Sequence, residues 1–373
     1  MKVCLYGYGL ATPGGGTSQY TKALGRQLVL EGHEVTVVTR RWANAVTVAD
    51  GLKYHFLSVD SKGPSAARAV RYALKSVLFF SRHRKDFDLI HCMSGFQIFS
   101  LLSAFIRKQV KIPMVYSVLS PFSRSFYLSA FDQLVCVSRN IEERLGFPGS
   151  VYIPPFIEVD RFRNGLPYDW AGGSRFVIGT MGYPAHRKGF RYFVEAMPLI
   201  LDRFPEASFV LAIDLPAMAY MEKLAEEKRL IERLIHQFGI EEKVKILGTV
   251  DAARFLHSID LFVYPVQTTE GMIDIPPTVL ECLAAGCGLV ASSQGGIGEV
   301  VREGYNGSLV PLGEHARPRA YADRVTELLE DRGRLDRIRR GGPESVLDFD
   351  VKKVVPQIVN VYQKVLSRER PGP

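Results

Sequence analysis

Short apolar runs alternate with helix-length amphipathic segments along most of this 373-residue sequence, which favours a parallel α/β sheet. The apolar run at 3–8 leads into a glycine triplet at 14–16, a helical pattern over 17–30 and a second apolar run at 34–39. Strand, glycine loop, helix and strand in this order form a βαβ unit. We therefore expect the chain to begin with a doubly wound, Rossmann-like domain.

The alternation breaks and then starts again. A segment rich in proline, glycine and polar residues at 154–173 has the composition of a linker, and strand and helix patterns resume at 176–179. A chain of this length usually divides into two domains. We expect a first domain over 1–165 and a second Rossmann-like domain over 174–350. We also expect the amphipathic segment 351–373 to pack back on the first domain.

The charge of the chain limits the classes of binding partner, and its cysteine content limits the cellular compartment. The net charge of +8 calls for an anionic partner, which can be nucleic acid, lipid headgroups or a phosphorylated small molecule. The most apolar stretch, 100–119, is interrupted by three basic residues and does not read as a membrane span. The N-terminus lacks a secretory signal, and the five cysteines lack metal-ligand spacing. These features favour the reducing cytoplasm.

Three segments place ligand-binding groups where α/β proteins bind ligands. The glycines at 14–16 precede a helix, where bare amides can approach an anion. Arg187 and Lys188 follow the first strand of the second domain, and Glu281 with the amides of 278–280 lies near a helix start. The alternatives are a plain tight turn, solvated loop cations and a glutamate favoured by the helix dipole.

The order and spacing of these and other short motifs resemble glycosyltransferase family 4, which has the GT-B architecture of two Rossmann-like domains facing across a cleft. The resemblance covers nearly the whole chain. The motifs that carry it are Gly14-Gly15-Gly16, Gly32-His33-Glu34-Val35, Asp88-Leu89-Ile90-His91, Val135-Cys136-Val137-Ser138, Ile153-Pro154, Asp160-Arg161-Phe162, Lys188-Gly189, Leu247-Gly248, Leu280-Glu281 and Gly304-Tyr305-Asn306-Gly307.

The resemblance implies transfer of a sugar from a nucleotide-diphosphate sugar, with retention of anomeric configuration and with neither a metal nor another cofactor. It implies that Lys188 neutralises the donor diphosphate, with Arg187 beside it, and that Glu281 holds the ribose. The remaining donor-binding residues that it implies are Gly248, Thr249 and Val250 along the base, Thr278, Val279 and Leu280 at the phosphate, and Gly15 and Gly16 from the other domain.

The chain departs from the family at three positions. Ile273 stands where the family has an acidic residue that contacts the transferred sugar, which leaves Glu270 and Asp274 as the candidates to replace it, and we favour Glu270. Tyr183 stands in place of an arginine, which leaves Arg187 as the neighbouring cation.

The third departure lies in the first domain, where Leu119 stands in place of a histidine. His91 follows a strand there and is our further catalytic candidate, with a structural role as the alternative. Two other functions stay open. One is a nucleotide-sugar epimerase on the same fold, and the other is a catalytically degenerate subunit that binds donor or partner, which the missing histidine and the displaced acid favour.

A stripe of basic residues lies in the first predicted domain, at 62–85. Residues 61–85 hold seven lysines and arginines and no acid, and the charges at 68, 71, 75 and 82 recur at helical spacing. Such a stripe at 62–85 can rest on anionic lipid, or it can be a solvated helix face. The acceptor is expected to be a glycan, a lipid-linked sugar or a small molecule, with the protein peripheral on the inner face of the membrane. Nucleic acid is not expected, because no recognised binding module accompanies the charge.

Overall fold

The computed structural model describes most of the chain, and its residues fall into two compact units. The described residues are 1–10, 16–40, 48–49, 51–57, 65–94, 97–121, 126–168, 176–213, 222–311, 313 and 318–369. The first unit comprises Met1–Phe156, Glu270–Asp274 and Val351–Pro373, and the second comprises Ile157–Thr269 and Ile275–Asp350.

The first unit is built on an eight-stranded sheet in the order β3-β4-β2-β1-β5-β6-β7-β8. Its pairs are parallel except β3 with β4, and the strand order reverses between β1 and β5. The strands are β1 (Lys2–Gly7), β2 (Glu34–Arg40), β3 (Val48–Ala49), β4 (Leu52–Leu57), β5 (Leu89–Ser94), β6 (Met114–Val118), β7 (Gln133–Cys136) and β8 (Val151–Tyr152).

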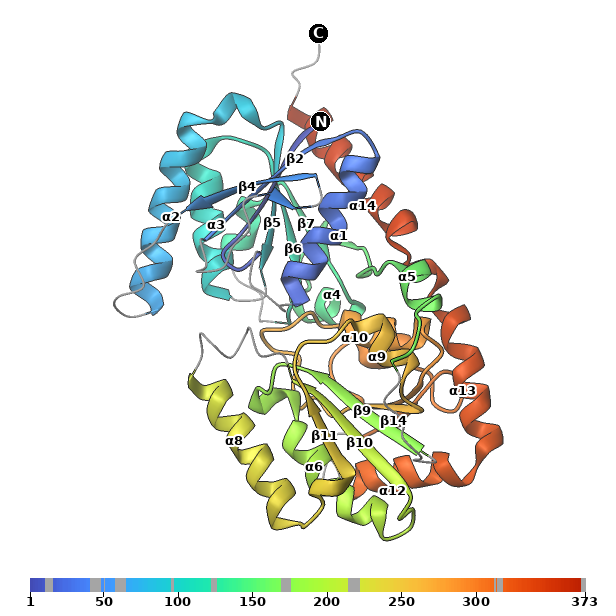
Figure 1. Ribbon diagram of the computed structural model, residues 1–373. Helices are drawn as coiled ribbons and strands as arrows, with labels where there is room; N and C mark the ends of the chain where they lie inside the picture. Colours follow the sequence, from blue (N-terminus) through green and yellow to red (C-terminus); the bar gives the residue numbers. More distant parts are fainter. Residues whose placement is uncertain are drawn as a thin grey trace. The chain divides into compact units, whose positions relative to one another are not determined.

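Helices cover both faces of this sheet. In Figure 1, α2 and α3 lie on one side of the strands, and α1 and α14 lie on the other. The helical segments of the first unit are α1 (Gly16–Leu30), α2 (Ser65–Arg82), η1 (Arg84–Asp86), α3 (Gln97–Val110), η2 (Phe126–Ala130), α4 (Arg139–Leu145) and α14 (Val351–Glu369).

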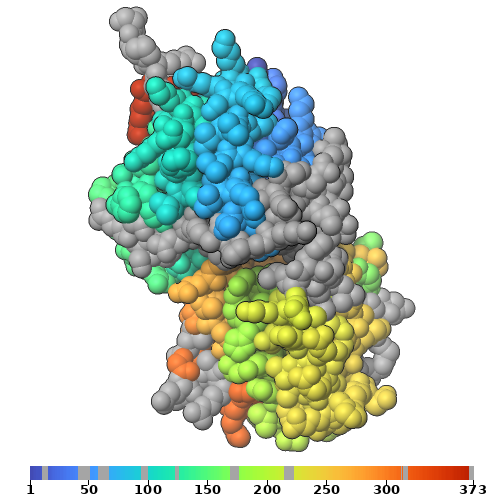
Figure 2. Space-filling view, turned by 90° about the vertical axis from the view of Figure 1, so that its left-hand side faces the viewer, coloured from blue at the N-terminus to red at the C-terminus, as the bar shows by residue number. Residues whose placement is uncertain are grey.

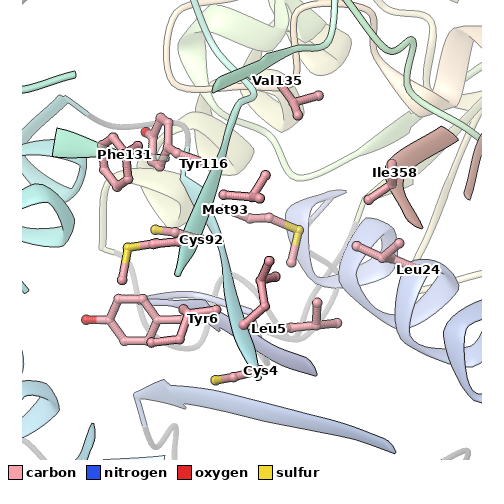
Figure 3. Close-up of a cluster of buried hydrophobic side chains, with 14 of the residues drawn as sticks. Cys4, Leu5, Tyr6, Leu24, Cys92, Met93, Tyr116, Phe131, Val135 and Ile358 are labelled. Atoms are coloured by element: carbon pink, nitrogen blue, oxygen red, sulfur yellow. The ribbon is translucent and has the colours of Figure 1, made fainter. Parts of the chain in front are cut away.

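Alternating side chains of the central strands supply the core on each face of the sheet. Tyr6 and Cys92 point to one side in Figure 3, whereas Met93 points to the side where Leu24 of α1 and Ile358 of α14 lie. All five residues are buried. The C-terminal helix therefore completes the core of the first unit, as the sequence predicts.

The second unit has a fully parallel six-stranded sheet in the order β11-β10-β9-β12-β13-β14, which reverses between β9 and β12. Its strands are β9 (Phe176–Gly182), β10 (Ala207–Ile213), β11 (Val244–Leu247), β12 (Leu261–Tyr264), β13 (Gly288–Ser292) and β14 (Ser308–Val310). Its helical segments are α5 (Val159–Arg163), η3 (His186–Lys188), α6 (Phe190–Leu201), α8 (Glu222–Gln237), η4 (Glu241–Lys243), α9 (Ala252–His257), α10 (Pro277–Ala284), α11 (Ile297–Val300), α12 (Pro318–Glu330), α13 (Arg332–Ser345) and η5 (Leu347–Phe349).

The two sheets confirm the predicted pair of Rossmann-like folds. The segment that we interpret from sequence as a linker contains α5, whose Val159 and Phe162 are buried in the second unit. Residues 100–119 form parts of α3 and β6. Within the described ranges, none of the helices combines the length and the apolarity that a bilayer crossing needs.

Candidate functional site

Lys188 lies at the carboxyl edge of the second sheet, where the strand order reverses. It ends the η3 turn that follows β9, the strand that pairs with β12. The next residue, Gly189, has a φ of 72°, and a Cβ there would lie 1.8 Å from the carbonyl oxygen of Pro265. Only glycine lets the turn approach the end of β12 this closely. Ligands of open α/β sheets bind at such a reversal.

Hydrogen bonds hold this turn against the segment after β12. The amide of Gln267 donates to the carbonyl of Arg187 at 2.8 Å, and the side-chain nitrogen of Gln267 donates to the carbonyl of Pro265 at 2.6 Å. Gln294 in turn donates to the carbonyl of Gln267 at 2.8 Å. The backbone that carries Arg187 and Lys188 is therefore fixed to the sheet edge.

Two tyrosines surround the ammonium group of Lys188. Its Nζ donates to the hydroxyl of Tyr264 at 3.3 Å and lies 5.2 Å from the ring centroid of Tyr183. Burial opposes the charge, but the two tyrosine oxygens outweigh it and raise the pKa of Lys188. The side chain is therefore cationic at neutral pH.

Arg187 is oriented by Tyr183, which stands at the position of the family's arginine. Its Nη2 donates to the Tyr183 hydroxyl at 3.0 Å. Its Nε is buried and has no acceptor among the residues that the structure describes, and the same holds for Nε of Arg191 in the first turn of α6. Buried donors of this kind need an acceptor, and an anionic ligand supplies one.

Glu281 lies on α10, which begins immediately after Pro276. The first helical residue is Pro277, so Thr278 supplies the first amide donor of the helix, and Glu281 is the fifth residue. Val279 and Leu280 are buried beneath it. Burial raises the pKa of Glu281 to about 7, although the positive charges of Arg161 and Lys188 act to lower it.

Glu281 and Lys188 thus belong to one electrostatic cluster, and the cluster includes residues that sequence reasoning did not assign. The side chain of Arg161 forms a 2.9 Å ion pair with Asp251, which also accepts from the amide of Arg254 and caps α9. The sequence shows the motif at 160–162 but not that Arg161 lies beside Asp251 and Glu281. For Asp251, the available sequence signal is its position directly before a helix, where aspartate is a common N-cap.

The loop at 248–250 connects β11 to the Asp251 cap. Gly248 and Val250 are half-buried, whereas Thr249 is exposed. Because the sheet is parallel, these three residues lie at the same carboxyl edge as Lys188. They follow β11, the outermost strand, whereas Lys188 follows the central strand β9.

Candidate residues of the first unit lie in different surroundings. Gly15 lies outside the described residues, and Gly16 is the exposed first residue of α1. His91 is fully buried, with Nδ1 at 2.6 Å from the hydroxyl of Tyr362 and Nε2 at 2.7 Å from Oγ of Ser117. Burial lowers the pKa of His91 to about 3, so its ring is neutral and ties β5 to α14 and β6.

The two acidic candidates lie on the segment Glu270–Asp274, which belongs to the first unit. Asp274 is buried and accepts hydrogen bonds from Oγ of Ser138 at 2.6 Å and from Asn140 at 2.8 Å. Ile273, which occupies the family's acidic position, is buried in the core of the first unit. Glu270 is exposed. The hydrogen bonds of Asp274 favour a positioning role, whereas the carboxylate of Glu270 is accessible.

Other groups that invite a chemical interpretation have structural surroundings. Oδ2 of Asp86 lies 2.7 Å from Nδ1 of His83, and Oδ2 of Asp88 accepts a hydrogen bond from the amide of Lys2 at 2.7 Å. All five cysteines are buried thiols. No group of three or more His, Cys, Asp or Glu side chains within the described part of the chain is arranged to hold a metal ion.

Two Rossmann-like sheets, with a cation and a helix-borne glutamate at the strand reversal of the second, are the arrangement expected of a GT-B glycosyltransferase. Residues 14–161 match the family model described as Glycosyltransferase Family 4, and residues 175–331 match the model described as Glycosyl transferases group 1. The chain belongs to glycosyltransferase family 4.

Individual relatives agree with this assignment. The chain is 26% identical to an uncharacterized glycosyltransferase of Methanocaldococcus jannaschii, with 94% of each chain covered. It is 27% identical to the phosphatidyl-myo-inositol mannosyltransferase of Mycobacterium leprae, over 58% of this chain and 54% of that protein. Among solved structures, sucrose-phosphate synthase from Thermosynechococcus elongatus superposes with a TM-score of 0.81 at 19% identity, over 99% of this chain and 100% of that one. The Anabaena HepE structure with UDP and glucose has a TM-score of 0.77 at 16% identity, over 97% and 99% of the two chains.

Proposed function

We propose that the second unit binds a nucleotide-diphosphate sugar, with Lys188 and Arg187 on the diphosphate and Glu281 on the ribose hydroxyls. The observation that carries the proposal is the placement of Lys188 after β9 and of Glu281 on α10 after β12, the two neighbouring strands between which the sheet order reverses. A carboxylate accepts two hydroxyl donors at once, and a half-buried cation suits a diphosphate. The HepE structures hold UDP and UDP-glucose, which supports a donor of this class.

The proposed chemistry follows from this arrangement. The bond between the anomeric carbon and the diphosphate oxygen breaks while an acceptor oxygen forms a bond to the same carbon. Negative charge grows on the leaving diphosphate, and Lys188, Arg187 and the amide of Thr278 stabilise it there. Transfer with retention, and without a metal or other cofactor, is part of the proposal.

Residues of the first unit belong to the acceptor side in this proposal. Glu270 is assigned the contact with the transferred sugar, because its carboxylate is exposed on a segment anchored by Asp274. Asp274 and His91 are assigned positioning roles, because their polar atoms already have buried partners. Gly15 and Gly16 would approach the ligand through their backbone.

The proposed acceptor is a lipid-linked glycan or lipid headgroup, and the proposed location is the cytoplasm and the inner face of its membrane. The similarity to a protein named phosphatidyl-myo-inositol mannosyltransferase supports a lipid acceptor. The basic helix α2 supports contact with anionic membrane, and nucleic acid is not proposed as a partner.

A panel of UDP, GDP and ADP sugars tests the proposal, first by thermal shift and then by release of the nucleotide in the presence of acceptors. The wild-type protein should bind one donor and release its nucleotide faster with the right acceptor. The variants Lys188→Gln and Glu281→Gln should lose both effects, whereas Lys245→Gln, which removes an exposed lysine of the same unit, should retain them. Conversion of the donor sugar would indicate an epimerase, and binding without release would indicate a donor-binding subunit. Either result contradicts transfer.

A further inference from the structure

Exposed apolar side chains gather on one part of the first unit. Ten large apolar side chains are exposed among the residues that the structure describes, and six of them lie on α2, α3 and η2. We call this set the α2–α3 surface, and it comprises Val70, Leu74, Leu78, Leu101, Phe105 and Phe126. Phe126 is 87% exposed and Leu78 is 59% exposed. Apolar exposure that is concentrated in this way marks an interaction site.

The segments that carry this surface are neighbours. Helices α2 and α3 pack against each other on one face of the sheet, and η2 packs on α3. Figure 2 looks onto α2 in light blue and α3 in teal, side by side on the face that is turned to the viewer. The exposed residues of α2 recur every four positions from Val70 to Leu78, and Leu101 and Phe105 of α3 have the same spacing. Residues with this spacing share one face of a helix.

Positive charge accompanies the apolar residues. Helix α2 contains no acidic residue, and its Arg71, Lys75 and Arg82 are exposed next to the apolar positions. Lys108 and Lys111 are exposed at and after the end of α3. A free anionic solute would need only the charge. The core of a protein interface is depleted in lysine. An anionic bilayer matches both properties, because it offers phosphates above an acyl boundary.

We propose that the α2–α3 surface docks onto an anionic lipid bilayer, with the apolar side chains at the acyl boundary and the basic side chains at the phosphates. This inference rests on the proposed function, because docking on the bilayer would bring a lipid-linked acceptor to the enzyme. It extends the contact from the basic residues of α2 to Leu101, Phe105 and Phe126.

Co-sedimentation with phosphatidylcholine vesicles, with and without phosphatidylglycerol, tests this proposal. The wild-type protein should bind only the anionic vesicles. Each basic residue near an anionic surface contributes about fivefold to binding, so R71Q/K75Q/R82Q should bind about 100-fold more weakly. V70S/L74S/L78S should also lose binding. The matched control is Leu30→Ser on α1, where a leucine is 80% exposed outside the surface, and it should bind as the wild type does.

Nucleotide binding and circular dichroism on the same variants separate docking from folding and from donor binding. Unchanged nucleotide binding with lost vesicle binding supports the proposal, because the second unit is intact. Vesicle binding without nucleotide binding would reject the proposed function and retain the docking surface. The docking proposal is overturned if the wild type ignores anionic vesicles, or if both triple variants still bind them. A protein dimer that the V70S/L74S/L78S variant dissociates, with no vesicle binding, would identify a second copy as the occupant.

A separate observation concerns Tyr183. Its hydroxyl accepts from Nη2 of Arg187 at 3.0 Å, and its ring lies 5.2 Å from Nζ of Lys188. A hydroxyl that accepts from Arg187 still has its own proton to donate, and the adjacent Nε of Arg187 is a buried donor without an acceptor among the described residues. The hydroxyl of Tyr183, Nε of Arg187 and Nζ of Lys188 are therefore three donors in one short segment, which suits the several oxygens of a diphosphate.

We infer that Tyr183 compensates for the family's missing arginine by positioning Arg187 and by donating its own hydroxyl proton to the donor diphosphate. This inference also rests on the proposed function. The variant Tyr183→Phe keeps the ring and removes only the hydroxyl. It should bind the nucleoside diphosphate about tenfold more weakly, which is the usual effect of one hydrogen bond to a charged group. Binding of the corresponding nucleoside should not change.

A double-mutant cycle with Arg187→Gln distinguishes positioning from a general structural effect. If Tyr183 acts through Arg187, the double variant should lose less affinity than the two single losses combined. Tyr305→Phe is the matched control, because Tyr305 is a tyrosine of the same unit that is 41% exposed and lies in a different segment from the η3 turn. The inference is wrong if Y183F binds the diphosphate with wild-type affinity, or if its affinities for nucleoside and diphosphate fall together.

Discussion

Replacement of Glu281 by glutamine should make the free protein more stable while abolishing donor binding. The wild-type side chain is half-buried, and loss of solvation raises the pKa of its carboxyl from the ordinary value of 4.5 to about 7. In the unfolded chain the same carboxyl ionises near its ordinary value. Above pH 7, therefore, the folded protein holds a carboxylate that solvent would stabilise better, and folding is penalised.

The magnitude follows from the shift. At about 1.4 kcal/mol per pH unit, the rise in pKa corresponds to a penalty of about 3 kcal/mol at pH 8. The sign is that of a raised carboxyl pKa: the penalty is absent below pH 4.5, grows as pH rises towards 7 and is constant above it. For a unit of this size, about 3 kcal/mol corresponds to an increase in Tm of about 6 to 12 °C.

Differential scanning calorimetry of wild type and Glu281→Gln at pH 5 and pH 8 measures this directly. The variant should melt several degrees higher at pH 8, with a much smaller difference at pH 5. Glu242→Gln, which changes an exposed glutamate of the same unit, is the control and should show no such gap. Equal melting temperatures at pH 8, or wild-type nucleotide affinity in Glu281→Gln, would refute the reasoning.

Three further predictions concern the same two units. Lys188→Gln should weaken binding of the nucleoside diphosphate by about 10- to 100-fold in isothermal titration, because it removes the charge-assisted hydrogen bonds to phosphate. Gly189→Ala should lower the free energy of unfolding by more than about 2 kcal/mol in urea titrations, because its Cβ would collide with the carbonyl of Pro265 at a φ of 72°. His91 is buried and neutral with its pKa lowered to about 3, so its contribution to stability is present above pH 6.5 and is lost as pH falls towards 3. As the pH is lowered from 7 to 4, the melting temperature should therefore fall more steeply for the wild type than for His91→Gln.

Sequence patterns located the buried strands well. The apolar runs at 3–8 and 34–39 match the strands Lys2–Gly7 and Glu34–Arg40 to within one residue at each end, because most side chains of both strands are buried. Strand β4 and helix α5 were not predicted. Lys53 and Tyr54 give β4 a mixed, half-exposed pattern, and the short helix α5 is hidden within a stretch rich in proline and glycine.

The site was only partly readable for a different reason. Motif order pointed to Lys188 and Glu281, but Arg161 and Asp251 approach Glu281 from two other segments, and no local pattern reports such proximity. The same limit applies to Asp274. Its spacing in the sequence resembles that of a displaced catalytic acid, whereas its burial against Ser138 depends on how the segment Glu270–Asp274 packs into the first unit.

The most direct measurement is a crystal structure of the protein with the nucleoside diphosphate that raises its melting temperature most in the UDP, GDP and ADP panel. Our account predicts the diphosphate oxygens on Lys188 and Arg187 and the ribose hydroxyls on the carboxylate of Glu281. A nucleotide bound elsewhere, or bound with its ribose away from Glu281, would contradict it.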